Sequence, residues 1–329
     1  MVSRPLPKKR ERRSPIGLFI LVLLLVTSAW VNHAFHDPTV RKQKPATKPV
    51  MPPVYVLSPS PATNPVLPRL PFAIGETSGV LWNLNTHQLL WQLNPHQVGP
   101  LASTTKLMTI YLALHRLPLK KVITISPNAA STTGSDMKMA PNNHFTVKQL
   151  LYGLMLASAN DSAVQLAETM GGHTANFVSQ MNQQAKAFGM NGTHYADPDG
   201  LSPHSVGTAW DLSIIAMRDL SHPLFRQIVN TRVTSIPHNP VLRNLNGLLF
   251  QDPTVIGVKT GWTTAAGFNL VFAATRKVHG HSVTLLGVIM HGQMGFPPVY
   301  TDAENILNWG FKEVAHAPHP TPQQAHVTP

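Results

Sequence analysis

The sequence predicts a mixed α/β fold of the α+β kind, in which an antiparallel sheet is flanked by helices and carries a helical subdomain. Two observations lead to this class. Strand-like runs occur near both ends of residues 71–314, and helix-like periodicity fills most of the segment between them. Strands from the two ends can share one sheet when the helices between them form an insertion. The segment holds about 240 residues, a size that one domain can reach, and we find no internal repeat in it.

The expected strands are short runs rich in branched and aromatic residues, bounded by turn residues. Residues 80–83 and 89–93 flank an Asn-Thr-His turn and are expected to form a hairpin. Further strands are expected at residues 121–126, 233–236, 255–262, 268–274 and 282–290.

The expected helices are runs with apolar residues at helical spacing. They cover residues 103–115, 146–157, 161–170, 175–188, 209–220 and 302–311. Thr146 and Gln149 stand three positions apart at the start of the second helix and form a plausible capping box.

Three short motifs follow one another along the chain and together are typical of a serine acyl-transfer site. They are Ser103-Thr104-Thr105-Lys106, Ser158-Ala159-Asn160 and Lys259-Thr260-Gly261. Each has an ordinary interpretation by itself: a surface lysine, a turn between helices and an edge-strand lysine, respectively. A second Ser-x-x-Lys at residues 135–138, in a turn-like stretch, shows that the first motif alone is weak. The ordered set makes the ordinary interpretations together much less plausible.

The first motif offers a nucleophile and its base. A serine hydroxyl needs a base within hydrogen-bond reach, and a lysine one helical turn later can touch it. The helix that follows is almost entirely apolar, so Lys106 is expected to be buried. Burial lowers the pKa of a lysine and makes its neutral form available as a base. The backbone N–H of Ser103, at the start of a helix, can help to hold an oxyanion.

The other two motifs offer groups that hold a substrate. A hydroxyl at Ser158 can relay a proton to a leaving amine, and the Asn160 amide can hold a peptide group. On a strand edge facing a cleft, Lys259 could attract a carboxylate and Thr260 could hydrogen-bond it. Gly261 would let a substrate approach the backbone closely.

These motifs and their surroundings resemble the D-alanyl-D-alanine carboxypeptidase family, the low-molecular-mass penicillin-binding proteins. The resemblance covers residues 71–314, about three quarters of the chain. Beyond the three motifs it includes residues 102–109, 150–155, 158–161, 188–190, 197–201, 259–267 and 308–311. It implies the β-lactamase/transpeptidase-like fold, which agrees with the α+β prediction.

The resemblance also implies roles for the matching residues. Ser103 would be acylated by the penultimate D-alanine of a peptidoglycan stem peptide after activation by Lys106. Ser158 and Lys259 would pass protons and hold the terminal carboxylate, while Asn160 would bind the peptide.

Further roles implied by the resemblance concern the backbone and the inhibitors. The N–H groups of Ser103 and Trp262 would form the oxyanion hole. Water would hydrolyse the acyl-enzyme, and β-lactam antibiotics such as penicillin would acylate the same serine. Trp262 stands where the family more often has Tyr or His, so its side chain is expected to affect substrate preference. No cofactor or metal is expected.

Four other functions could also be associated with these motifs or with the fold that they imply. A class A β-lactamase needs a glutamate to activate water, and the only glutamate between Asn160 and Lys259 is Glu168, in an ordinary helical pattern. A D,D-endopeptidase would use the same residues in a differently shaped cleft. A transpeptidase is disfavoured by the single small domain. A non-catalytic wall-binding protein is disfavoured by the intact motifs.

The chain outside residues 71–314 predicts export. Residues 1–15 carry six basic residues and one acidic residue, and residues 16–31 form an apolar run typical of a signal peptide or signal-anchor. We expect residues 1–15 in the cytoplasm, residues 32–70 as a Pro-rich disordered linker, and residues 315–329 as a disordered tail. The catalytic part would then lie on the extracytoplasmic, periplasmic side of the inner membrane.

Composition excludes several other classes. Of the formal net charge of +12, residues 1–15 contribute +5 and residues 37–70, with five basic residues and one acidic, contribute +4, so nucleic-acid binding is disfavoured. The absence of cysteine excludes disulfides, thiolate metal sites and a cysteine nucleophile. The 17 histidines form no His-Glu-x-x-His array and are expected to be scattered over surface and loops.

Overall fold

A computed structural model describes residues 67–316 of the 329-residue chain. The predictions for residues 1–15, 16–31, most of the linker 32–70 and nearly all of the tail 315–329 lie outside the described residues.

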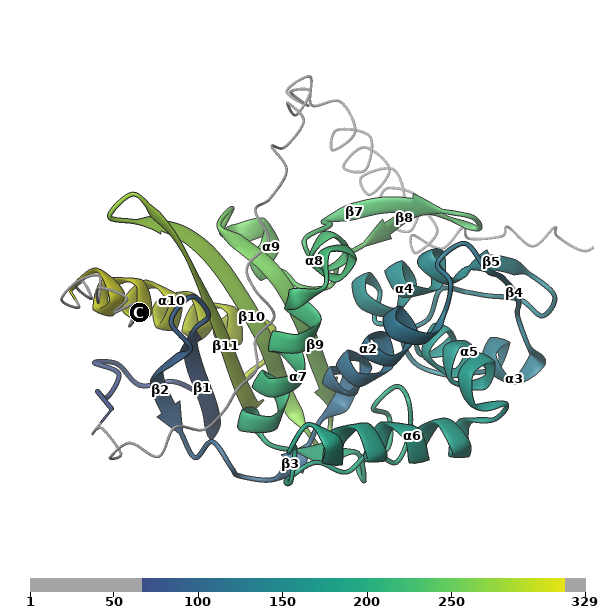
Figure 1. Cartoon of the computed structure of the whole chain (residues 1–329), viewed down its shortest axis with the longest axis horizontal. Coiled ribbons are helices and arrows are strands. Elements are labelled where there is room, and N and C mark those ends of the chain that lie inside the picture. The colour runs from purple at the N-terminus through teal and green to yellow at the C-terminus, as the bar shows by residue number, and fades with distance from the viewer. Residues whose placement is uncertain (1–66, 317–329) are drawn as a thin grey trace, which may run out of the picture. The chain divides into compact units, whose positions relative to one another are not determined.

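The central sheet has five antiparallel strands in the order β2-β1-β11-β10-β9. They are β1 (Ser78–Asn83), β2 (Gln88–Leu93), β9 (Val255–Thr263), β10 (Gly267–Val278) and β11 (His281–Gly292). Ser78 of β1 pairs with Met290 of β11, so strands from the two ends of the domain lie side by side (Figure 1). The predicted antiparallel sheet is confirmed.

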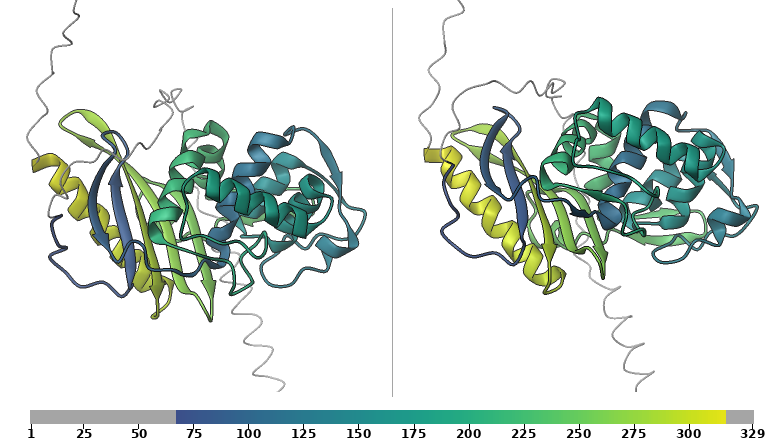
Figure 2. Two further views of the ribbon diagram at one scale, coloured as in Figure 1. Left: turned by 60° about the horizontal axis from the view of Figure 1, so that its bottom comes forward. Right: turned by 90° about the horizontal axis from the view of Figure 1, so that it is seen from below.

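Helices cover both faces of this sheet, with α10 (Phe296–His316, yellow) across one face and α7 (Ala209–Ser221) on the other (Figure 2). Side chains alternate along each strand, so Val80 and Val288 join the core shared with α7. Leu81 and Leu285 join the core shared with α10. The helix α10 approaches the sheet closely at Gly310, where a Cβ would lie 2.5 Å from a methyl carbon of Leu81.

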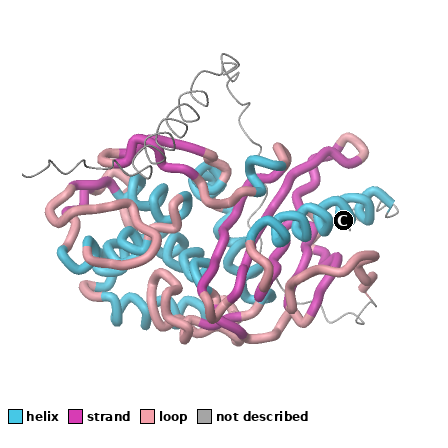
Figure 3. The backbone as a smooth tube through the Cα atoms, turned by 180° about the vertical axis from the view of Figure 1, so that it is seen from behind, coloured by secondary structure: helices cyan, strands magenta, loops and turns pink. Residues whose placement is uncertain are grey.

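The helical subdomain is inserted between β2 and β9, and Figure 3 shows most of the helices gathered to one side of the long strands. Its helices are η1 (Ala102–Thr105), α2 (Lys106–Arg116), α3 (Pro127–Ala130), α4 (Val147–Leu156), α5 (Asn160–Gly171), α6 (Thr174–Ala187) and α8 (Pro223–Val229); α9 (Leu248–Gln251) precedes β9. The capping box predicted at Thr146 and Gln149 is present at the start of α4. The predicted helical insertion is therefore confirmed.

Three two-stranded ribbons complete the described fold. They pair β3 (Gly99–Pro100) with β6 (Val206–Gly207), β4 (Val122–Thr124) with β5 (His144–Thr146), and β7 (Val233–Ile236) with β8 (Asn239–Arg243). The strands expected at residues 121–126 and 233–236 thus exist, but each pairs in its own ribbon outside the central sheet.

Two helices differ from the prediction in type or by more than one residue at an end. The helix expected at residues 103–115 begins as a 3₁₀ turn at Ala102 and continues as α2. The helix expected at residues 302–311 is longer and covers Phe296–His316. It can begin before residue 302 because Pro297 and Pro298 lie in its first turn, where a proline costs no intrahelical hydrogen bond. Its last turn includes Ala315 and His316, so the expected disordered tail does not begin at residue 315.

Within residues 67–316 we find no helix that combines the length and the apolar character needed to cross a bilayer.

The sheet core generates a stability prediction. Phe272 is fully buried, and its ring occupies the space beside Gly287, where a Cβ would lie 2.1 Å from a ring carbon. Phe272→Ala should lower the free energy of unfolding by about 3–5 kcal/mol, because it leaves a cavity in a packed core. Urea unfolding followed by circular dichroism measures this. Val241→Ala, at a position that is 62% exposed, is the control and should change it by less than about 0.5 kcal/mol. Equal effects would contradict the core assignment.

Candidate active site

The serine of the first motif directly follows a residue with an unusual backbone conformation. Ser103 is the second residue of η1 and is partly exposed. The residue before it, Ala102, has a φ of +48°, in the left-handed region that non-glycine residues rarely adopt. Such strain persists only where the surrounding structure fixes it.

One part of that surrounding structure is β9. A Cβ on Gly261 would lie 3.0 Å from the Thr104 nitrogen, 3.1 Å from the Leu101 oxygen and 3.2 Å from the Ser103 nitrogen. Only glycine allows the strand to approach the start of η1 this closely. The backbone of β9 at Gly261 therefore lies beside the backbone nitrogen of Ser103.

The other part is a turn at residues 197–201. Gly200 has a φ of +85°, and a Cβ there would lie 1.8 Å from the Ala102 oxygen. The Asp197 carboxylate accepts hydrogen bonds from the N–H groups of Gly200 (3.1 Å) and Ser202 (2.6 Å), which fixes the shape of the turn. The turn therefore packs against the backbone of Ala102, the residue before Ser103.

Lys106 connects three segments of the chain. Its Nζ lies 3.0 Å from Ser103 Oγ, 2.7 Å from Asn160 Oδ1 and 2.6 Å from the Asp199 carbonyl oxygen. An ammonium donates to all three partners. A neutral amine can still donate to the amide and the carbonyl while it accepts the proton of Ser103 Oγ. The geometry therefore suits a base that changes protonation state without moving.

Burial makes the neutral state accessible. The Lys106 side chain is fully buried, and desolvation lowers its pKa to about 8, although Asp199, Asp197 and Asp161 oppose the shift. The sequence-based expectation of a buried lysine with a lowered pKa therefore agrees with the structure.

A second serine and lysine form a similar pair. Ser158 lies between α4 and α5 with a φ of +58°, and Lys259 Nζ donates to its Oγ at 3.0 Å and to the Thr260 carbonyl at 2.8 Å. Lys259 is 1% exposed. Burial, together with the nearby charge of Lys106, lowers the pKa of Lys259 well below its ordinary value. A bound anion would favour its charged form again.

Asn160 is more constrained than its sequence position suggests. Its Oδ1 accepts from Lys106, and its Nδ2 donates to the Thr133 carbonyl at 2.8 Å. Its backbone N–H donates to the Ser135 carbonyl at 2.7 Å. Both ends of the amide therefore orient the base and the loop that precedes β5.

The end of β9 carries the remaining predicted residues. Thr260 is 6% exposed, whereas the ring of Trp262 is 52% exposed and lies 5.7 Å from the ring of Phe268, centroid to centroid. Within the structure, the predicted site residues thus form two connected groups, one around Lys106 and one around Lys259, with β9 packed against η1.

Sequence reasoning gave no role to several groups that hold this arrangement. Asn269 on β10 donates through Nδ2 to the carbonyls of Pro100 and Leu101, both at 3.1 Å. Thr109 donates to the Pro198 carbonyl at 2.6 Å, and the Asp199 carbonyl is the third partner of Lys106. The resemblance over residues 197–201 marked the turn, but not which backbone oxygen would face the lysine.

Among residues 67–316 no cluster of histidine and acidic side chains has the arrangement of a metal site. The Glu168 carboxylate, weighed above for a β-lactamase, accepts from Ser126 Oγ and Asn128 Nδ2, both at 2.6 Å. It ties α5 to α3, as an ordinary helical residue would.

The fold and the two serine-lysine pairs define the class of a serine peptidase with an antiparallel sheet and a helical subdomain. A family model described as D-alanyl-D-alanine carboxypeptidase matches residues 66–293. The chain therefore belongs to the D-alanyl-D-alanine carboxypeptidase family of serine peptidases, and the resemblance stated from the motifs is confirmed.

Individual relatives carry three related names. The chain is 31% identical over 244 residues to a D-alanyl-D-alanine endopeptidase of Escherichia coli (72% of this chain, 77% of the relative). It is 31% identical over 240 residues to the D-alanyl-D-alanine carboxypeptidase DacB2 of Mycobacterium tuberculosis (70% and 81%). The crystal structure of the Streptomyces K15 DD-transpeptidase superposes with a TM-score of 0.67 at 30% identity, covering 73% of this chain and 98% of that one. The predicted β-lactamase/transpeptidase-like fold is confirmed.

The contact between Gly200 and Ala102 generates a test of the nucleophile segment. Gly200→Ala should lower the rate of acylation of Ser103 by a fluorescent penicillin at least about 100-fold, because a small displacement of a reacting group is costly. The matched control is Gly189→Ala, since Gly189 has a φ of +74° but open space around its Cβ position. A similar loss in both variants would mean that backbone strain, and not the contact with Ala102, is responsible.

Proposed function

We propose that this chain is a serine D-Ala-D-Ala carboxypeptidase that removes the terminal D-alanine from peptidoglycan stem peptides through an acyl-enzyme on Ser103. The observation that carries the proposal is the contact of Lys106 Nζ with Ser103 Oγ at 3.0 Å, in a fully buried environment that lowers the pKa of the amine to about 8. Family membership limits the reaction to this class of serine peptidase.

In the proposed acylation, neutral Lys106 takes the proton of Ser103 Oγ as the oxygen attacks the carbonyl carbon of the penultimate D-alanine. The N–H groups of Ser103 and Trp262 hold the negative oxygen of the tetrahedral intermediate. The C–N bond then breaks, and the leaving amine receives, by way of Ser158, the proton that Lys106 took from Ser103. A water molecule afterwards attacks the acyl-enzyme, giving the shortened peptide and free Ser103.

Lys259 and Thr260 would hold the terminal carboxylate of the substrate. Lys259 has two neutral acceptors, the Ser158 hydroxyl and the Thr260 carbonyl, and no ion pair within the described residues. A carboxylate would favour the charged form of this buried amine and give it a charged partner. Asn160 would contact the peptide while it remains bonded to Lys106, and β-lactam antibiotics would acylate Ser103 in place of the substrate.

An endopeptidase activity is the second candidate, because the Escherichia coli relative described above is named a D-alanyl-D-alanine endopeptidase. Hydrolysis of a D,D-crosslink would use the same nucleophile and the same base. The two activities would differ in whether the cleft accepts a larger leaving group.

We also propose that the catalytic segment, residues 71–314, acts on the wall side of the cytoplasmic membrane, where peptidoglycan lies. Residues 16–31, outside the described part of the chain, would serve as the signal peptide or membrane anchor, and residues 32–70 as the linker. Family membership on a wall substrate supports this location.

Mass spectrometry of a stem pentapeptide ending in D-Ala-D-Ala tests the reaction. The parent chain should release one D-alanine, and Ser103→Ala should release none and form no penicillin adduct. Ser235→Ala, at an exposed position on β7, is the control and should keep both activities. Cleavage of a crosslinked dimer but not of the pentapeptide would establish the endopeptidase instead. Neither product nor adduct with the parent chain would overturn both candidates.

The lowered pKa of Lys259 generates a separate prediction. If Lys259 is largely neutral before binding, a substrate carboxylate should draw a proton onto it, because the carboxylate raises its pKa. Calorimetry of Ser103→Ala with the pentapeptide, in buffers of different ionisation enthalpy at neutral pH, should show net uptake of up to about one proton. The same titration with Lys259→Met should show weaker binding and no uptake. Uptake that persists in Lys259→Met would assign the proton to another group.

A further inference from the structure

We propose that Asp199 is a positioning residue for Lys106: its backbone carbonyl holds the amine, and its buried carboxylate sets the protonation state in which the amine meets Ser103. The proposal rests on the proposed acyl-enzyme reaction at Ser103 and adds to it the group that determines at which pH Ser103 is deprotonated. Nothing in the three motifs assigns a role to this side chain.

The backbone of Asp199 cannot move easily. The turn at residues 197–201 is fixed internally by the Asp197 carboxylate. It is fixed to α2 by the hydrogen bond from Thr109 to the Pro198 carbonyl and by the 2.6 Å bond from Lys106 to the Asp199 carbonyl. The contact of Gly200 with Ala102 adds a third restraint, so the distance between Asp199 and Lys106 is set by the fold.

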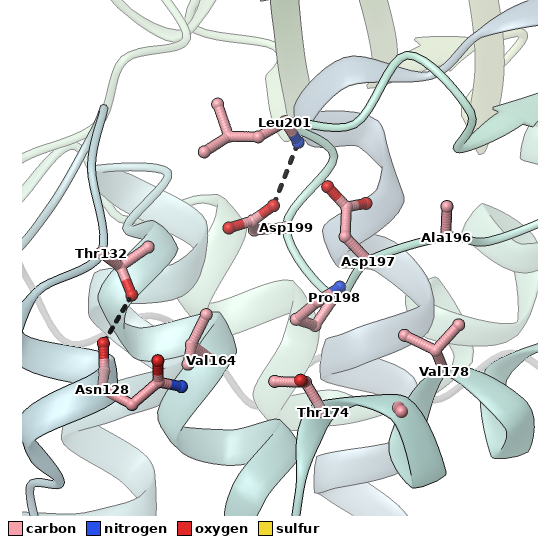
Figure 4. Close-up of a pocket in the computed structure, with 11 residues that line it drawn as sticks. Asn128, Thr132, Val164, Thr174, Val178, Ala196, Asp197, Pro198, Asp199 and Leu201 are labelled. Atoms are coloured by element: carbon pink, nitrogen blue, oxygen red, sulfur yellow. Dashed lines mark hydrogen bonds between the residues drawn. The ribbon is translucent and has the colours of Figure 1, made fainter.

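The Asp199 carboxylate is buried and has few hydrogen-bond partners. Asp199 is 4% exposed, and its Oδ1 accepts one hydrogen bond, from the Leu201 N–H at 3.0 Å (Figure 4). Within residues 67–316 it makes no ion pair at salt-bridge distance. The side chain lines an open pocket of about 510 Å³. Figure 4 shows it with Thr132 and Leu201, which line the same pocket. The charge of Lys106 lowers the pKa of this carboxyl, whereas the neighbouring Asp197 carboxylate raises it.

Three carboxylates act on Lys106. Asp199 is the strongest of the carboxylates that favour its charged form, ahead of Asp197 and Asp161. Asp161 is compensated by the N–H groups of Met137, Met139 and Ser162.

Two other ionisable groups lie near Lys106. Asp197 is a carboxylate with several hydrogen-bond donors, and Lys259 is a base. Asp197 is compensated by the turn N–H groups and the Ser205 hydroxyl. Burial together with the charge of Lys106 lowers the pKa of Lys259, across the site, well below the ordinary value. Asp199 has the fewest compensating donors, so its charge reaches Lys106 with the least screening.

The sign of the effect follows from these contacts. Burial, with a smaller contribution from the neighbouring Asp197 carboxylate, raises the pKa of the Asp199 carboxyl to about 6, against the opposing effects of Lys106 and the Leu201 N–H. Near neutral pH Asp199 is therefore mostly ionised and stabilises the ammonium of Lys106. Removal of the negative charge should favour the neutral amine, so Ser103 should be deprotonated at lower pH than in the parent protein.

The test measures the second-order rate of acylation of the full chain by a fluorescent penicillin between about pH 6 and pH 9. In the parent protein the rate should rise with pH through the pKa of Lys106 at about 8. Asp199→Asn keeps an acceptor for the Leu201 N–H and should move this rise toward acid by about one pH unit. On the rising limb that shift corresponds to a rate about tenfold higher. Asp199→Glu should restore part of the parent profile.

Two further variants and one direct measurement complete the test. Asp211→Asn removes a buried carboxylate that accepts from Gly192 and Thr193 and does not act on Lys106, so the position of its rise should match the parent. Titration of the parent with ¹³C-labelled lysine, using Lys106→Arg to assign the resonance, should show a minor step near pH 6 in addition to the main step near pH 8.

Each outcome decides the proposal. The proposal is supported if the rise of the acylation rate moves toward acid in Asp199→Asn and does not move in Asp211→Asn. If Asp199→Asn fails to fold, the minor step of the Lys106 resonance in the labelled parent supports it. A uniform loss of rate in Asp199→Asn with an unmoved profile, or a single step in the labelled parent, overturns it. Absence of acylation in the parent protein at every pH would instead mean that the proposed function is wrong.

Discussion

The arrangement depends most on one interaction, the set of three hydrogen bonds made by the buried amine of Lys106. Its partners are the Ser103 hydroxyl in the same helical turn, the Asn160 amide at the start of α5 and the carbonyl of Asp199 in the turn before β6. A buried amine without partners would be costly, so the segments that supply them must come together when the domain folds. The same bonds orient the amine toward the serine, and stability and chemistry therefore share one constraint.

The sheet supplies the second wall of the site through its edge strand. β9 reaches the nucleophile because Gly261 allows the strand backbone to contact residues 101–104, and because Asn269 on the neighbouring strand binds the carbonyls of Pro100 and Leu101. The helical subdomain supplies the first wall through α2 and α5. The site thus lies where an inserted helical layer meets an edge strand, and a strained residue, Ala102, is held between the two.

Two lysines in one buried site have an electrostatic consequence. Burial destabilises both ammonium groups, and the charge of Lys106 further destabilises that of Lys259, so the site favours fewer protons than two ordinary lysines would hold. Carboxylates near Lys106 offset part of this effect, whereas Lys259 has only neutral acceptors among the described residues. The two lysines therefore occupy different environments. The environment of Lys106 suits a base, and that of Lys259 suits an amine that becomes charged when a substrate anion binds.

The sequence by itself determined the family, the antiparallel sheet with its helical insertion, and the order of Ser103, Lys106, Ser158 and Lys259, because these depend on local periodicity and on short motifs. The burial of Lys106 also followed from its apolar helix. Only the tertiary structure decided that the strands at residues 122–124 and 233–236 pair outside the sheet, that Asn160 is bonded at both ends, and that Asp199 lies against the base. These features depend on contacts between residues that are distant in the sequence, and neither hydrophobic periodicity nor a motif records which backbone oxygen will face a buried amine.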